Sequence, residues 1–157
     1  MRLRVIAVGT RMPVWVDAAV EDYSRRLGGF CKFELKTLNP ASRREASGDE
    51  RAAKALEGKR ILALLSERDV AVPLDEHGKQ LTTLELSRWL GEQRGLGSDL
   101  AFIIGGPDGL AAEVLARGRM VWALSRLTLP HALARVVLAE QLYRAATVLS
   151  GHPYHRA

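Results

Sequence analysis

Cysteine and long apolar runs are almost missing from this sequence. Its only cysteine is Cys31, which excludes a disulfide framework and predicts a reduced core residue. No apolar stretch approaches the ~20 residues that a membrane span needs, and no signal-peptide pattern precedes the first predicted strand. These absences favour a cytoplasmic protein without a membrane partner.

The common glycine-rich phosphate motifs are missing as well. The sequence has no GxGxxG fingerprint, and no Lys-Ser or Lys-Thr pair follows its glycines as a P-loop requires. Instead, the apolar run 100–104 leads into Gly105-Gly106-Pro107-Asp108-Gly109. A buried strand that ends at paired glycines predicts a ligand cradle at the carboxyl edge of a sheet, although a tight turn without a ligand has the same pattern. Because the Asp108 carboxylate would repel a polyphosphate, this cradle suits a neutral or cationic ligand.

A second turn and a long helix follow. Residues 121–129 predict a strand that Pro130 ends, and residues 131–150 predict a single helix. This helix is apolar around most of its circumference, so we expect one side on the sheet and the other against a second copy in a two-fold homodimer. Four residues are expected to share one polar stripe: Glu140, Tyr143, Arg144 and Thr147. The i,i+4 pair of Glu140 and Arg144 is either an ordinary surface ion pair or a catalytic one.

The C-terminal tail is unusually rich in functional side chains. His152, Tyr154, His155 and Arg156 fall within five residues, whereas chain ends are usually frayed. Two histidines without a nearby acid or cysteine make a poor ligand set, so we expect no metal. Aromatic rings that stack on unpaired bases and an arginine that holds phosphate favour RNA as the partner.

Charge and element order agree with that interpretation. The chain has 23 Lys and Arg against 18 Asp and Glu, which favours a polyanionic partner. We expect one domain, 1–157, with a mainly parallel sheet flanked by helices. The predicted strands are 3–8, 30–38 and 69–74, with a turn at 75–79, and the predicted helices are 14–27, 49–66 and one from Thr82 or Thr83 to Gly95. The polar segment 39–49 is expected to be a loop that is either solvated or in contact with RNA phosphate.

Four motifs together resemble a known family. They are the run from Phe102 to Leu110 (FIIGGPDGL), the run from Leu124 to His131 (LSRLTLPH), Glu140 to Ala145 (EQLYRA) and His152 to Arg156 (HPYHR). In this order and spacing they are similar to the RlmH family, SPOUT-class methyltransferases of bacterial large-subunit ribosomal RNA. The resemblance extends over nearly the whole chain and is poorest from about Asn39 to Lys59.

The resemblance implies a trefoil-knotted α/β domain, a homodimer, S-adenosylmethionine as methyl donor, and methylation of N3 of a pseudouridine in a 23S rRNA stem-loop. It implies a cofactor site at Leu74, Gly106, Ser125, Arg126, Leu127, Thr128, Leu129 and Pro130. It implies a substrate side at Glu140, Arg144, Tyr154, His155 and Arg156. In the mechanism we expect, Glu140 or His155 accepts the proton of the base, and Arg144 stabilises the negative charge that develops on it.

Two other functions remain possible from the sequence alone. A non-catalytic RNA- or ribosome-binding protein would use the basic surface without binding S-adenosylmethionine. A doubly wound nucleotide-binding regulatory domain would bind phosphate at the Gly105 turn, which Asp108 and the missing lysine disfavour. The sequence does not distinguish free rRNA from the assembled ribosome as substrate.

Overall fold

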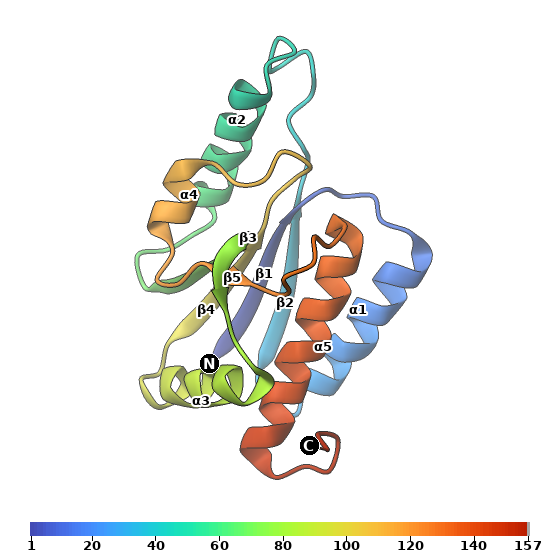
Figure 1. Ribbon diagram of the computed structural model, residues 1–157, viewed down its shortest axis with the longest axis vertical. Coiled ribbons are helices and arrows are strands. Elements are labelled where there is room, and N and C mark those ends of the chain that lie inside the picture. The colour runs from blue at the N-terminus through green and yellow to red at the C-terminus, as the bar shows by residue number, and fades with distance from the viewer. Residues whose placement is uncertain (157) are drawn as a thin grey trace.

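The computed structural model describes residues 1–156 and has a five-stranded sheet with helices on both faces (Figure 1). All neighbouring strands are parallel, in the order β2-β1-β4-β3-β5. The strands are β1 (Arg2–Val8), β2 (Lys32–Leu38), β3 (Asp69–Gln80), β4 (Asp99–Ile104) and β5 (Trp122–Ala123). The helices are α1 (Val14–Leu27), α2 (Glu50–Ala63), α3 (Thr83–Gly95), α4 (Ala112–Arg117) and α5 (His131–Ser150). The parallel α/β sheet expected from the sequence is confirmed, and the trefoil knot stays a prediction.

Successive residues of the central strands point into two separate cores. Leu3 of β1 and Phe102 of β4 pack with α1, α3 and α5 on one face of the sheet. Ile6 and Ile103 pack with α2 and α4 on the other face. Because both faces are covered, the carboxyl edge of the sheet is where loops can form a ligand site. Among residues 1–156, no helix combines the length and apolar character needed to cross a membrane.

Local sequence signals predicted several helix ends correctly. The helices α1 and α5 have the bounds expected from apolar spacing and from the prolines before them. Thr82 caps α3: its hydroxyl accepts from the Glu85 N–H at 3.2 Å, and the Glu85 carboxylate accepts from the Thr82 N–H at 2.7 Å. Helix α2 is shorter than predicted and begins after Asp49, whose side chain accepts from the Arg51 N–H.

Two predictions around β3 and β5 are wrong. The expected turn at 75–79 is a continuation of β3, and only Trp122–Ala123 of the expected strand 121–129 pairs with it. The polar segment after Leu74 resembles a turn in sequence, but its backbone is hydrogen-bonded to β5 through an irregular register, with the Lys79 N–H donating to the Val121 carbonyl at 2.8 Å. Gly78 permits this approach, because a Cβ there would lie 2.8 Å from the Val121 backbone. The rest of 121–129 is consequently free to form a loop.

Candidate functional site

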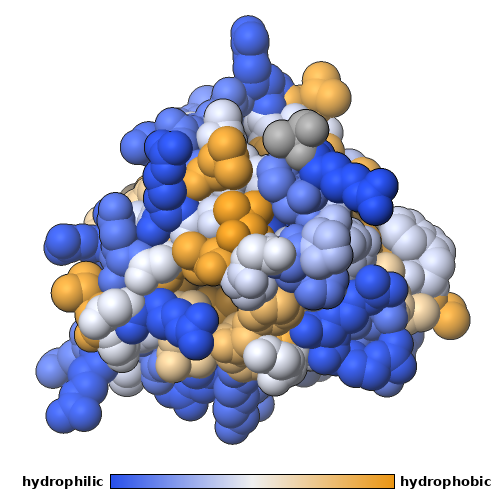
Figure 2. All heavy atoms as spheres, turned by 90° about the horizontal axis from the view of Figure 1, so that it is seen from below, coloured by the Kyte–Doolittle hydropathy of each residue, from blue (hydrophilic) through white to orange (hydrophobic). Residues whose placement is uncertain are grey.

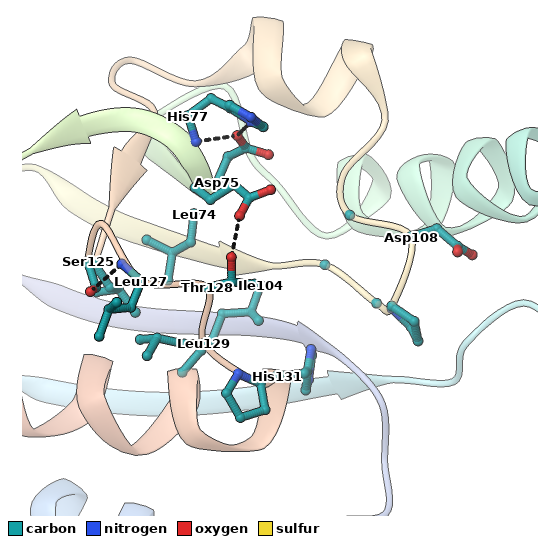
Figure 3. Close-up of a pocket in the computed structure, with 18 residues that line it drawn as sticks. Leu74, Asp75, His77, Ile104, Asp108, Ser125, Leu127, Thr128, Leu129 and His131 are labelled. Carbon is teal, nitrogen blue, oxygen red and sulfur yellow. Dashed lines mark hydrogen bonds and ion pairs between the residues drawn. The ribbon is translucent and has the colours of Figure 1, made fainter.

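Three chain segments surround one cavity at the carboxyl edge of the sheet. The cavity has a volume of ≈ 540 Å³ and lies between the end of β4, the middle of β3 and the loop before α5 (Figure 3). Its lining includes seven of the eight residues expected at the cofactor site: Leu74, Gly106, Ser125, Leu127, Thr128, Leu129 and Pro130. The eighth, Arg126, is exposed and does not line the cavity. Segments separated by about fifty residues in sequence are therefore brought together here.

The glycine turn presents bare backbone to this pocket. Gly109 has φ +81°, and its N–H donates to the Gly106 carbonyl at 3.0 Å, which closes the turn. A Cβ on Gly105 would lie 2.8 Å from the Gly109 backbone, and one on Gly106 would lie 3.1 Å from Oε2 of Glu57. Glu57 is itself buried and accepts from the Ala41 N–H at 3.0 Å. The buried carboxylate behind the turn was not predicted, because nothing in sequence connects α2 to the glycines.

A buried histidine–arginine pair supports the floor of the pocket. His131 lines the cavity, and Arg135, one helical turn later, is only 3% exposed. The Arg135 guanidinium donates to Nε2 of His131 at 3.2 Å and to the Gly9 carbonyl at 2.5 Å. Burial, then the Arg135 charge, lower the pKa of His131, while a hydrogen bond of its ring with the Gly105 backbone opposes this shift. His131 is therefore neutral, with Nε2 as acceptor and its proton on Nδ1.

The polar part of the pocket is acidic. Asp75, Glu76 and Asp108 line it, and the described lining residues include no lysine or arginine. Asp75 accepts from the His77 N–H at 2.9 Å within β3, and Glu76 accepts from the Thr128 hydroxyl at 2.8 Å, which connects β3 to the loop before α5 (Figure 3). In a chain of net charge +5, this local negative charge favours a cationic ligand.

The expected substrate residues form a second cluster, centred on Glu140. Its Oε1 accepts from Nε of Arg144 at 2.8 Å and from the Tyr154 hydroxyl at 3.1 Å, and its Oε2 accepts from the Gln141 amide at 2.7 Å. The predicted ion pair is therefore present and partly buried. The predicted polar stripe is wrong for Tyr143 and Thr147, which are buried. Tyr143 turns instead toward Tyr23 and Phe30, against which its ring packs.

The tail folds back along α5. Gly151 ends the helix with φ +67°, and the His152 N–H donates to the Thr147 carbonyl at 2.9 Å. Within residues 1–156, Nδ1 of His155 is buried without a hydrogen-bond partner, while Arg156 is exposed. Figure 2 views the molecule from the end that carries the tail and shows mostly hydrophilic side chains around a smaller apolar area.

The two clusters are not brought together within one chain. The pocket lies at the first residues of α5 and the tail follows its last residue, at the opposite end of the helix (Figure 1). The 20 residues of α5 span about 30 Å at 1.5 Å per residue. The tail folds back only as far as Glu140, which Tyr154 contacts, and none of the residues 152–156 lines the cavity of its own chain.

Comparison with known proteins gives the family. Residues 1–155 match the family model described as "Predicted SPOUT methyltransferase". The chain belongs to the SPOUT methyltransferase family. A protein of Thiobacillus denitrificans named ribosomal RNA large subunit methyltransferase H is 51% identical over 156 residues, 99% of each chain. A protein of the same name from Bordetella avium is 49% identical over 158 residues, covering all of both chains.

A solved structure has a similar overall fold. The structure of a probable methylase family protein from Haemophilus influenzae matches 99% of this chain and 70% of its own, with a TM-score of 0.56 at 14% identity. At that identity the likeness concerns the fold alone. The family model and the full-length relatives confirm the family that the four motifs indicated.

The pocket fits the methyl donor of a SPOUT methyltransferase. S-adenosylmethionine combines a sulfonium and an ammonium group with one carboxylate, so it is a net cation. The acidic residues Asp75, Glu76 and Asp108 match that charge, and the bare backbone of the glycine turn leaves hydrogen-bonding groups accessible to an adenosine. Among residues 1–156, no group of three or more potential ligand side chains could hold a metal ion.

Proposed function

We propose that this chain is an S-adenosylmethionine-dependent methyltransferase of large-subunit (23S) rRNA that methylates N3 of a pseudouridine in a stem-loop. The observation that carries the proposal is the acidic, glycine-walled pocket formed by β3, the β4 turn and the loop before α5. The names of the full-length relatives supply the substrate class. A ribosomal substrate would place the chain in the cytoplasm.

A homodimer would complete the active site. The outer side of α5 carries Leu133, Val136 and Val137, which are apolar and only partly buried. Pairing two copies through this side, with the two α5 helices running in opposite directions, would bury these residues and bring the tail of one copy to the pocket of the other. Support for this arrangement comes from the pocket of one chain, whose lining includes none of the tail residues 152–156.

In this mechanism the protein mainly orients the reactants and moves one proton. The donor supplies an activated methyl group on a sulfonium, so placement in line with the base nitrogen matters more than covalent catalysis. Oε1 of Glu140 already accepts from Arg144 and Tyr154, which leaves it poorly available as a base. His155, whose side chain is partly exposed in the tail, is the better candidate to accept the N3 proton. Arg144 would stabilise the negative charge on the ring.

The test is methyl transfer from isotope-labelled S-adenosylmethionine to assembled ribosomes and, separately, to free 23S rRNA. We expect one labelled pseudouridine, which mass mapping would locate. Comparing the label incorporated into ribosomes with that in free 23S rRNA shows which of the two the enzyme recognises. RNA binding without label, together with no uptake of S-adenosylmethionine in titration calorimetry, would instead identify a non-catalytic RNA-binding protein.

The composite site can be tested by mixing two inactive variants. Gly106→Val forces a side chain against Glu57 and Val8 and so displaces the turn that lines the pocket, and a chain stopped after Gly151 lacks the tail. Co-expression should restore part of the activity, because each mixed dimer has one intact pocket facing one intact tail. If each copy used its own tail, mixing would restore nothing.

A further inference from the structure

The side chain of Tyr154 is already fully engaged in the folded protein. Its hydroxyl donates to Oε1 of Glu140 at 3.1 Å and lies 3.4 Å from the hydroxyl of Tyr23. Its ring centroid is 4.7 Å from that of Tyr143, and the guanidinium carbon of Arg144 is 4.8 Å from the same ring. These contacts come from two helices, α1 and α5, and hold the tail against both.

Such an environment does not suit a base-stacking residue. A ring that stacks on an RNA base must offer one face to it, and stacking needs no hydroxyl. The Tyr154 ring is instead packed against Tyr143 and Arg144, and its hydroxyl donates to the partly buried carboxylate of Glu140. Burial, followed by the hydrogen bond with Tyr23, raises the pKa of Tyr154, so the phenol remains a donor to Glu140 at every physiological pH.

We propose that Tyr154 is a positioning residue whose hydroxyl fastens the C-terminal tail to Glu140, and that His155 and Arg156 alone face the RNA. This inference deepens the proposed function and rests on it for the role of the two following residues. The Gly151 turn and the hydrogen bond from His152 to Thr147 fix the start of the tail, and Tyr154 fixes it three residues later. The tail is thereby ordered before RNA arrives, and less conformational entropy is lost on binding.

The substitution Tyr154→Phe distinguishes the two roles of this side chain. It removes the hydroxyl that bonds to Glu140 and keeps the ring that could stack on a base. If the hydroxyl fastens the tail, amide hydrogen exchange in the peptide that covers residues 150–157 should accelerate by about tenfold or more, given the usual strength of a hydrogen bond to a carboxylate. The kcat for methyl transfer should fall by a similar factor, with the Kd for S-adenosylmethionine unchanged. Tyr154→Ala should lower kcat further, because it also removes the ring contacts.

Tyr143→Phe is the matched control. It removes a hydroxyl from the same aromatic cluster, but that hydroxyl makes no hydrogen bond to Tyr154. Tail exchange should therefore stay at the wild-type rate in this variant.

Three results would overturn the inference. One is a Tyr154→Phe protein with wild-type kcat beside an inactive Tyr154→Ala protein, which is the pattern of a stacking ring. The others are accelerated exchange without loss of kcat, and loss of kcat without accelerated exchange. If the wild-type protein methylates no RNA, the proposed function fails, whereas the exchange rates still decide whether the hydroxyl fastens the tail.

Discussion

Arg135 donates to the imidazole Nε2 of His131 at 3.2 Å, and the same guanidinium reaches the carbonyl oxygens of Val8 and Gly9 at the end of β1. One buried side chain therefore connects the first strand to the floor of the pocket, 126 residues later in sequence. The connection requires His131 to be neutral, because a protonated imidazole has no acceptor to offer Arg135.

Stability should consequently depend on pH through His131. The pKa of His131 is lowered in the folded state, whereas an unfolded chain titrates near the ordinary value of about 6.5. Below that pH the His131 imidazole is protonated in the unfolded chain but stays neutral in the folded one. The free energy of unfolding should therefore fall as the pH drops from about 6.5. Urea denaturation at several pH values measures this, and His131→Gln should remove part of the slope.

Gly106 should be sensitive to a single methyl group. In Gly106→Ala the new Cβ would lie 3.1 Å from Oε2 of Glu57 and 3.3 Å from Cγ1 of Val8, so either the turn or the buried carboxylate must move. We expect a loss of about 1–3 kcal/mol in stability and weaker binding of S-adenosylmethionine. Gly95→Ala, where nothing lies within 4 Å, should raise stability by about 0.4–1 kcal/mol. Wild-type donor affinity in Gly106→Ala would show that the turn is not part of the site.

The negative lining of the pocket should distinguish the methyl donor from its product. Transfer of the methyl group turns a sulfonium into a neutral thioether and removes one positive charge from the ligand. Asp75→Asn and Asp108→Asn should each weaken S-adenosylmethionine binding by about threefold at low salt, with little effect on S-adenosylhomocysteine. Titration calorimetry with both ligands measures the difference. Equal losses for the two ligands would mean that the carboxylates shape the pocket rather than select by charge.

The outer side of α5 should control assembly. A lone subunit would tolerate a glutamate in place of Val137, because this position is partly exposed there. In the dimer the same carboxylate would be buried without a positive charge to pair with. Val137→Glu should therefore be monomeric by light scattering, inactive on ribosomes and still able to bind S-adenosylmethionine. Leu96→Glu, at a residue 75% exposed on another surface, should remain dimeric and active. A monomeric Val137→Glu protein with full activity would exclude the composite site.

What the sequence could predict depended on how local the signal was. The bounds of α1, the Thr82 cap and the glycine turn at Gly106 followed from patterns within a few residues, whereas Leu127 was expected at the pocket only through the family resemblance. The extension of β3 could not be predicted, because the polar residues after Leu74 look like a turn until Val121 is known to lie beside them.

Long-range polar contacts escaped prediction for a similar reason. Glu57 behind Gly106 and Arg135 beside Gly9 look like ordinary helix-surface residues in sequence, and only the packing of α2 and α5 on the sheet buries them. The contact between Tyr154 and Glu140 depends on the chain reversal at Gly151, which placed an expected base-stacking ring against its own helix.

The length of α5 sets the distance between the pocket and the tail. Each residue added to or removed from the helix between Arg135 and Glu140 would shift the tail by 1.5 Å and swing it about 100° around the axis. In a homodimer both copies would carry the changed helix, so the tail would be displaced at each of the two composite sites. The length of this helix should accordingly tolerate far less change than its outward-facing side chains do.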